Sequence, residues 1–281
     1  MNIAVTGASG FIGRHLTERL RSESHTVRAV SVRTPPRPEN FEGCAAVVHL
    51  AGEPVAQRWT AAARERIRAS RVDGTRALVD ALRARPPRVL VSASAVGYYG
   101  SRGDEVLKED SPPGSDFLVG VVTRWEREAL AAEEFGVRVV RLRTGMVLGP
   151  GGGALQRMLL PFRLGLGGRI GDGKQWMSWI HLDDLTALIS FALATPALSG
   201  AVNAGTPAPV TNAEFTRELA RALHRPAIFP VPRFALKLLF GEMAEIVYAS
   251  QRMVPDVALR AGFDFKFPEI GPALRNILAA G

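Results

Sequence analysis

Three glycines, Gly7, Gly10 and Gly13, recur at intervals of three residues directly after the first apolar run of the chain. Between a buried strand and a helix, this spacing gives a tight turn, a close backbone approach to a diphosphate, and close packing of the helix on the strand. The N terminus of the helix adds unpaired N–H groups and a dipole that favours phosphate. We therefore predict a dinucleotide-binding loop, with a glycine turn that binds nothing as the alternative. Its members are Gly7, Ser9, Gly10, Phe11, Ile12 and Gly13.

The end of the next expected strand, residues 26–32, indicates which dinucleotide the loop binds. Proteins that prefer NAD place Asp or Glu there, where the carboxylate binds the hydroxyls of the adenosine ribose. Here the strand ends near Ser31 and Arg33, and the first acidic residue after them is Glu39. A hydroxyl and an arginine fork suit a 2′-phosphate. We predict NADP(H), with the alternative that Arg33 extends into solvent.

A third strand, residues 45–50, runs into Leu50-Ala51-Gly52-Glu53 at the carboxyl edge of the expected sheet, where ligands bind. The small Ala51 and Gly52 allow a cofactor to pass close to the backbone. Glu53 is a candidate for binding a ribose hydroxyl or acting at the substrate, and it could equally cap the following segment. We include all four residues in the predicted cofactor site.

The elements that must position these residues alternate between strand and helix. Apolar runs expected to be strands lie at 2–6, 26–32, 45–50, 88–92 and 137–143, and helical patterns lie at 11–22, 60–85 and 117–135. Apolar strands that alternate with helices form a parallel sheet that is covered on both faces. We predict an α/β fold of the Rossmann type, a doubly wound parallel sheet with a smaller C-terminal substrate domain.

After Thr144 the pattern changes, and glycine-rich stretches separate shorter elements. We expect a helix over 154–164, a strand over 178–181, a helix over 182–194 and a strand over 201–204. Thr211 and Glu214 have the spacing of a capping box. We predict an NADP(H)-binding Rossmann domain over residues 1–150, to which residues 178–205 return, and a mostly substrate-binding domain over 151–281.

Composition narrows the class of protein. The 281 residues are 47% hydrophobic and 22% charged, and no run of about 18 uncharged apolar residues predicts a transmembrane helix. The N terminus lacks the basic region of a signal peptide. A single cysteine, Cys44, excludes an internal disulfide framework and fits a reducing compartment. We predict a cytoplasmic protein with no membrane partner.

The net charge of +8 raises the question of nucleic-acid binding. Only four of the 35 basic residues are lysines, and the arginines are spread along helices between glutamates rather than gathered in a block. We predict no nucleic-acid partner, although a cationic surface would attract an anionic cofactor or substrate. His181, Asp183 and Asp184 do not have the spacing of metal ligands, and no metal is predicted.

Several long strings of residues identify a family. They are Val5–Gly13, Leu50–Pro54, Ser92–Gly100, Thr123–Glu126, Arg143–Gly149, Leu160–Gly168, Trp179–Asp184 and the tail Phe234–Leu278. Over essentially its whole length the chain resembles the extended and atypical short-chain dehydrogenase/reductases, and more closely the epimerase family branch that includes human family member 39U. The resemblance implies NADP(H) on the first domain and a substrate pocket under the C-terminal domain. Relatives often carry Ser-Arg at the end of the second strand, where this chain has Ser31-Val32-Arg33.

The same resemblance indicates that this chain lacks two catalytic residues of active family members. Active members use a Tyr that exchanges a proton and a Lys four residues later, on the helix that here is expected over 117–135. Counting back from Glu126, these positions hold Leu118 and Val122, and neither side chain can transfer a proton. The relatives most similar to this chain also lack the pair.

Substitutes for the missing pair follow the fourth strand. Ser92 and Ser94 lie at the nicotinamide end of the expected site, and the family pattern favours Ser94 for binding a substrate oxygen. Tyr98 and Tyr99 come next, and a tyrosine beside a cation can serve as acid or base. In nucleotide-sugar epimerases, the tyrosine that matches Tyr99 contacts substrate and is not the catalytic one. Either tyrosine could instead pack with its hydroxyl bonded.

Residues of the second half complete the predicted site. Thr144 and Gly145 end the fifth strand and are expected beside the nicotinamide. Arg163 and Arg169 are candidates for holding an anionic substrate, or else surface charges. We expect His181 to order the following helix rather than to titrate in catalysis.

We predict an NADP(H)-dependent oxidoreductase or epimerase-like enzyme that acts on a small polar substrate as a monomer or homodimer. Ser94, Tyr98 and Tyr99 are its catalytic candidates. The alternative is a catalytically silent NADP(H)-binding protein that reports redox state to a partner. The missing Tyr/Lys pair favours the silent protein, whereas the glycine-lined pocket favours the enzyme.

Overall fold

The computed structural model describes residues 1–280, and the side chains of Arg233, Ala235, Leu239 and Phe240 lie outside that description. Its centre is a six-stranded sheet in the order β10-β6-β4-β3-β1-β2, and all neighbouring strands run parallel. The strand order grows outward from β1 in both directions, so the predicted doubly wound Rossmann-type sheet is confirmed. The strands are β1 Asn2–Thr6, β2 Thr26–Val30, β3 Ala46–His49, β4 Val89–Ala95, β6 Arg138–Thr144 and β10 Gly200–Ala204.

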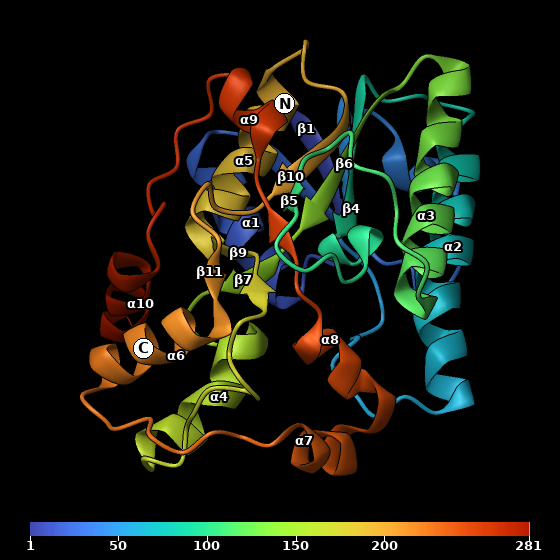
Figure 1. The fold of residues 1–281 in the computed structure, drawn as a ribbon. Coiled ribbons are helices and arrows are strands. Elements are labelled where there is room, and N and C mark those ends of the chain that lie inside the picture. The colour runs from blue at the N-terminus through green and yellow to red at the C-terminus, as the bar shows by residue number, and fades with distance from the viewer. Residues whose placement is uncertain (281) are drawn as a thin grey trace.

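Helices cover both faces of the sheet because successive strand residues point to opposite sides. Val5 and Val91 belong to the apolar cluster under α1 (Phe11–Ser22) and α5 (Leu182–Ala194). Ala4 and Leu90, their neighbours in sequence, belong instead to the cluster under α2 (Ala61–Leu82) and α3 (Phe117–Leu130). Figure 1 shows α2 and α3 side by side along one side of the sheet, with α1 and α5 on the other.

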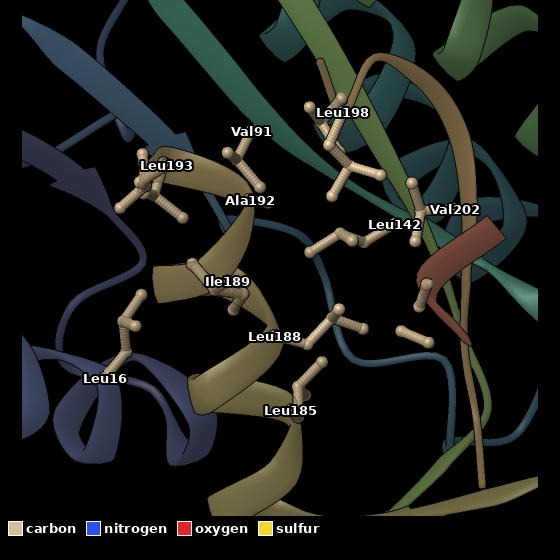
Figure 2. Close-up of a cluster of buried hydrophobic side chains, with 14 of the residues drawn as sticks. Leu16, Val91, Leu142, Leu185, Leu188, Ile189, Ala192, Leu193, Leu198 and Val202 are labelled. Carbon is tan, nitrogen blue, oxygen red and sulfur yellow. The ribbon is translucent and has the colours of Figure 1, made fainter. Parts of the chain in front are cut away.

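One strand and one covering helix come from the second half of the chain. β10 pairs with β6 over Gly200–Ala204. Leu185, Leu188 and Ile189 of α5 lie against the sheet, where Figure 2 shows them beside Leu142 and Val202. Each buried side chain of this size contributes about 2 kcal/mol of hydrophobic stabilisation. The sheet is therefore completed only by residues beyond 180.

The remaining elements form a second layer, most of it at the carboxyl end of the sheet. The helices are α4 Gly153–Arg163, α6 Asn212–Leu223, α7 Arg233–Phe240, α8 Ala244–Tyr248, α9 Asp256–Arg260 and α10 Ile270–Ala279. Three two-stranded sheets join β7 (Met146–Leu148) to β9 (Trp179–His181), β8 (Trp176–Met177) to β11 (Val210–Thr211), and β5 (Val106–Leu107) to β12 (Arg252–Met253). Figure 1 shows α4, α7 and α8 at the end of the sheet far from the N terminus.

Two predicted strands end two or more residues away from the expected position. β2 stops at Val30, because its partner β1 ends at Thr6, which pairs with Val30. The stretch that contains Ser31 therefore lies beyond the strand. β4 continues past the predicted end to Ala95, because β6 runs beside it as far as Thr144. The predicted capping box at Thr211 is present, with reciprocal hydrogen bonds to Glu214.

Candidate functional site

The β1–α1 loop has a separate steric reason for each of its three glycines. Gly7 has a φ of 70°, and a Cβ there would lie 2.9 Å from backbone atoms of Leu50 and Ala51. A Cβ on Gly13 would lie 2.1 Å from the carbonyl oxygen of Gly7, so only glycine lets α1 start this close to β1. At Gly10 the same oxygen is 3.2 Å away and no other atom lies within 4 Å. The space beside Gly10 is therefore open.

The first turn of α1 presents its N–H groups to this space. Gly10 is the N-cap of the helix, and no side chain caps it. The first helical hydrogen bond runs from the Arg14 N–H to the Gly10 carbonyl at 3.0 Å. The earlier N–H groups have no helical partner, and the dipole favours an anion there. A diphosphate fits this place, because a side chain on Gly10 would occupy it; Ser9, just before it, is exposed.

The two apolar residues of the loop face the protein. Ile12 packs against the cluster under α1 and α5. The Phe11 ring lies against the glycine-rich loop that precedes α4, where Cβ atoms on Gly149, Gly152 and Gly153 would lie between 2.5 and 3.1 Å from ring atoms. The start of α1 and the start of α4 are therefore packed together through Phe11.

The predicted 2′-phosphate residues lie on the surface just beyond β2. The Ser31 hydroxyl accepts a hydrogen bond from the Arg33 N–H at 3.3 Å, and both residues are exposed. A surface hollow of about 510 Å³ opens beside Ser31; Pro35 and Glu39 also line it, and Arg33 does not. The Arg33 guanidinium forms no salt bridge with the described residues, so it has no competing carboxylate. Binding of a 2′-phosphate by this pair stays a prediction.

Residues 50–53, which follow β3, contact the glycine loop through their backbone, whereas the carboxylate of Glu53 forms its contacts outside that loop. Leu50 and Ala51 abut Gly7. The Glu53 carboxylate accepts a hydrogen bond from Gln57 at 3.0 Å and lies 3.5 Å from Nε of Arg66. These contacts, that of Gln57 first, hold the pKa of Glu53 below its usual range. The structure thus engages Glu53 near the surface, and its contact with a ribose hydroxyl stays a prediction.

Gly52 lies against a cation that the sequence does not single out. A Cβ on Gly52 would lie 3.3 Å from Cζ of Arg71, which comes from α2. Nη1 of Arg71 donates to the carbonyls of Glu53 at 2.9 Å and Ile67 at 3.3 Å, and Cζ lies 5.2 Å from the centre of the Trp125 ring. Burial lowers the pKa of Arg71 to about 10, so the side chain is still charged at neutral pH.

His49, the last residue of β3, is buried beneath the same run. The Thr6 hydroxyl lies 2.7 Å from its Nδ1 and the Thr75 hydroxyl lies 2.9 Å from its Nε2. Burial, and then the charge of Arg71, lower the pKa of His49 to about 4. The imidazole is therefore neutral at physiological pH and joins β1, β3 and α2 in the core.

Ser94 belongs to a buried ionic network at the end of β4. Its Oγ donates to Oε1 of Glu126 at 2.6 Å. The same carboxylate accepts hydrogen bonds from Arg143 at 2.9 and 3.0 Å and from Arg141 at 2.7 Å. The register of β4 and β6 pairs Ser94 with Arg143, which brings both to α3 and Glu126. The Ser94 proton is thus directed at Glu126; Ser92, two residues earlier, is also buried.

The two tyrosines have different surroundings. Tyr99 is fully buried, and its hydroxyl donates to Asn203 at 2.6 Å and accepts from Arg143 at 3.0 Å. Burial raises the pKa of Tyr99 to about 12. Tyr98 is half-buried, with Cζ of Arg143 3.4 Å from its ring centre, and its hydroxyl forms no hydrogen bond among the residues described. Of the two, Tyr98 has the hydroxyl that is free to bind a ligand.

α3 presents apolar side chains where the family pattern implies the Tyr/Lys pair. A Cβ on Gly97 would lie 3.5 Å from Leu118 and 3.9 Å from Val122. Both side chains therefore face the segment that follows β4. Val122 is buried and Leu118 is half-buried, and neither of these two positions offers a group that exchanges protons.

Thr144 and Gly145 connect the large sheet to the second layer. The Thr144 hydroxyl donates to the Leu142 carbonyl at 3.1 Å. A Cβ on Gly145 would lie 2.7 Å from the carbonyl oxygen of Ser178, so glycine is needed where β6 passes the start of β9. Their place beside a nicotinamide stays a prediction.

The remaining candidates of the second half have other surroundings. His181 is buried, its Nδ1 accepts from the Asp183 N–H at 3.0 Å, and its ring stacks on Phe267. It caps α5, as expected from the sequence. Arg163 and Arg169 are exposed.

The structure thus joins some predicted residues and separates others. It joins the glycine loop to Leu50-Ala51-Gly52, and it joins Ser94, Tyr98 and Tyr99 through Glu126 and Arg143. It leaves Ser31 and Arg33 at the outer edge of the sheet. Sequence reasoning missed the roles of Glu126, Arg143 and Arg71. The register of β4 and β6 sets Arg143 opposite Ser94, and this pairing is the feature that could have identified Arg143. No feature of the sequence distinguishes Arg71.

Neither a metal centre nor a membrane span is found in the described chain. Within residues 1–280, no three His, Cys, Asp or Glu side chains are grouped so that they could hold a metal ion. No helix among these residues combines the length and the apolar character needed to cross a bilayer.

Comparison with known proteins places the sequence among relatives. The family described as the NAD dependent epimerase/dehydratase family matches residues 3–205, and a domain of unknown function, DUF1731, matches residues 231–277. The epimerase family protein SDR39U1 homolog, chloroplastic, of Arabidopsis thaliana is 41% identical over 99% of this chain and 87% of its own length. The human epimerase family protein SDR39U1 is 37% identical over 99% of this chain and 100% of its own length.

Solved structures with the same fold include two at more than 30% identity. The crystal structure of human SDR39U1 (isoform 2) with NADPH superposes with a TM-score of 0.92 and 36% identity, covering 99% of both chains. A nucleoside-diphosphate sugar epimerase from Corynebacterium glutamicum has a TM-score of 0.84 and 33% identity, covering 100% of this chain and 58% of its own.

Proposed function

The chain belongs to the NAD-dependent epimerase/dehydratase family, and from this premise we propose that it is an NADP(H)-dependent oxidoreductase or epimerase-like enzyme for a small polar substrate. The observation that carries the proposal is the β1–α1 loop, where Gly10 leaves space beside uncapped helical N–H groups. The human relative that was crystallised with NADPH matches the whole length of this chain, which supports the choice of nucleotide.

Residues along the carboxyl edge would hold the cofactor. The N–H groups that follow Gly10 would bind the diphosphate, because they combine free donors with the positive end of the helix dipole. Ser31 and Arg33 would bind the 2′-phosphate, and the backbone of Leu50–Gly52 would lie under the ribose. Ser92, Thr144 and Gly145 would line the nicotinamide end. When bound, NADP(H) supplies or accepts the hydride, which no side chain can do.

The substrate proton would move through Tyr98. Its hydroxyl is free of protein partners among the described residues, and Arg143 places a positive charge 3.4 Å from the ring centre. Tyr99 suits proton exchange less well, because its hydroxyl is bonded on both sides and its pKa is raised to about 12 by burial. Ser94 would bind the reacting oxygen of the substrate, with Glu126 fixing the orientation of its hydroxyl.

A specific observation also favours a second candidate function, an NADP(H)-binding protein without turnover. Leu118 and Val122 stand where active relatives are expected to carry Tyr and Lys, and the Ser94 proton is already bonded to Glu126. A site of this kind retains the nucleotide while its polar groups satisfy one another.

We further propose a cytoplasmic monomer or homodimer that binds no nucleic acid. The arginines support the absence of nucleic-acid binding, because many of them form salt bridges with glutamates on the surface. Arg76 pairs in this way with Glu128, and Arg68 with Glu65. Paired charges leave less positive potential for a phosphate backbone. Light scattering after gel filtration measures the oligomeric state.

Titration calorimetry with NADPH and NADH tests the binding, and we expect NADPH to bind more tightly. The NADPH-loaded protein is then mixed with aldehydes, ketones and nucleotide sugars, and the nicotinamide absorbance is followed. Oxidation of NADPH by one class identifies the enzyme, whereas no oxidation above the buffer rate leaves the silent binder. If neither nucleotide binds, both functions are wrong.

A further inference from the structure

Arg71 combines a half-buried position with an incomplete set of protein partners. Its guanidinium lies beside Gly52, where the chain leaves β3 at the carboxyl edge of the sheet. Nη1 is used by two backbone carbonyls, while Nε and Nη2 form no hydrogen bond, and the group forms no salt bridge, among the residues described. Arg143 and Arg141, at the neighbouring end of β6, are both bonded to Glu126 instead.

Arg71 is half-buried, so one part of its guanidinium is removed from water and needs partners, while another part stays accessible. Burial lowers the pKa of Arg71 but leaves it a cation at neutral pH. The Trp125 ring, 5.2 Å from Cζ, and the two carbonyls satisfy one side of the guanidinium. The donors on the other side are not enclosed by the protein, so a ligand bound at this edge of the sheet can reach them.

The position of Arg71 relates it to the missing lysine. Trp125 follows Val122 by three residues on α3, so the two side chains share one face of the helix. The guanidinium that stacks on Trp125 is therefore next to the place where the family pattern implies Lys. Gly52 follows Ala51, whose backbone contacts Gly7 of the phosphate loop. The Arg71 guanidinium thus lies between the β1–α1 loop and α3, at the carboxyl edge of the sheet.

We propose that Arg71 is a cofactor-binding residue whose free donors bind the hydroxyl groups of the ribose attached to the nicotinamide. It supplies from α2 the positive charge that is missing at Val122 of α3. A guanidinium suits this task, because its donors lie in one plane and can reach two adjacent hydroxyls. The inference rests on the proposed binding of NADP(H) and involves no covalent step.

The test compares two ligands on three proteins by titration calorimetry. NADPH carries the nicotinamide ribose, whereas adenosine 2′,5′-bisphosphate carries only the adenosine half. We expect Arg71→Met to weaken NADPH binding about tenfold or more, as expected for loss of charged hydrogen bonds. Binding of the bisphosphate should stay within about twofold, and Arg71→Lys should restore part of the NADPH affinity.

Arg76→Met is the matched control. Arg76 lies on the same helix, is exposed, and pairs with Glu128 of α3, so its loss should change neither ligand. Thermal melting checks that the variants fold. If Arg71→Met does not fold, Arg71→Gln replaces it, because it also removes the charge and should weaken the binding of NADPH alone.

Two results overturn the inference while NADPH still binds the wild-type protein. One is an unchanged NADPH affinity in Arg71→Met. The other is an equal loss for both ligands, which would assign Arg71 to the shape of the fold. Failure of the wild-type protein to bind NADPH is a different result, because it refutes the proposed function and the inference together.

Discussion

The two ends of the ligand-binding edge are built in opposite ways. At the β1–α1 end, glycines keep side chains away and leave helical N–H groups without partners. At the β4–β6 end, Ser94, Tyr99, Glu126 and Arg143 are bonded to one another. The first end needs a ligand to complete its hydrogen bonds, whereas the second completes most of them internally. Binding of a nucleotide and acid–base chemistry on it therefore depend on separate sets of residues, and one set can change without the other.

Glu126→Ala should have the largest effect if the β4–β6 end is a structural network. Removing the carboxylate leaves Arg143 buried without a counter-charge, which costs about 4 kcal/mol in the free energy of unfolding. Chemical denaturation measures this loss. Glu128→Ala is the matched control on α3, because Glu128 pairs with the exposed Arg76 and should cost under about 1 kcal/mol. Equal losses in the two variants would contradict the comparison.

Gly13→Ala should have the next largest effect on stability, and this effect should arise at the β1–α1 end. The added Cβ would lie 2.1 Å from the Gly7 carbonyl, so α1 must shift, at a cost of about 3 kcal/mol. NADPH binding should be lost with it, as calorimetry would show. Gly74→Ala on α2 is the control, since its Cβ meets nothing closer than 3.8 Å. That change should stabilise the helix by up to about 1 kcal/mol; a destabilised control would refute the steric argument.

His49 should make stability depend on pH in a defined window. Its pKa is about 4 in the fold against 6.5 for an ordinary histidine. Between these values the unfolded chain binds a proton that the folded chain does not, so stability falls as pH falls from 6.5 to 4 and is unaffected above 6.5. The loss amounts to about 3 kcal/mol. Denaturation at several pH values should show a smaller loss in His49→Gln; parallel curves for the two proteins would exclude His49.

The two tyrosines should give the smallest and most selective effects. Tyr99→Phe removes the donor to Asn203 and should cost about 2 kcal/mol in stability, because a buried amide oxygen is left unpaired. Tyr98→Phe removes a hydroxyl without partners in the described structure and should change stability by less than about 0.5 kcal/mol. Once a substrate is known, Tyr98→Phe should be the variant that loses turnover. Reversal of the two phenotypes would make Tyr99 the reacting group.

Local patterns predicted the fold well. The apolar runs and the helical periodicity located the strands and helices because each of these signals lies within a few residues. The ends of β2 and β4 were misplaced, since a strand extends only as far as its neighbour, and that neighbour is distant in sequence. The short strands such as β5 and β12 were missed for the same reason.

The site was predictable where backbone geometry decides it. Gly7, Gly10 and Gly13 follow from local sterics, and the structure assigns each a steric reason. Arg71 was not predictable, because one arginine among many in a helix has no distinguishing spacing. Its neighbours, Gly52 and Trp125, come from the loop after β3 and from α3, which only the folded chain brings together.

Completion of the sheet by β10 and α5 has a consequence for biosynthesis. When the first 150 residues have left the ribosome, β6 still lacks its outer neighbour and Leu142 still lacks the helix that covers it. An uncovered apolar face and an open strand edge are the features that drive association of nascent chains. The N-terminal half therefore cannot complete its sheet and core until residues 182–204 have been translated.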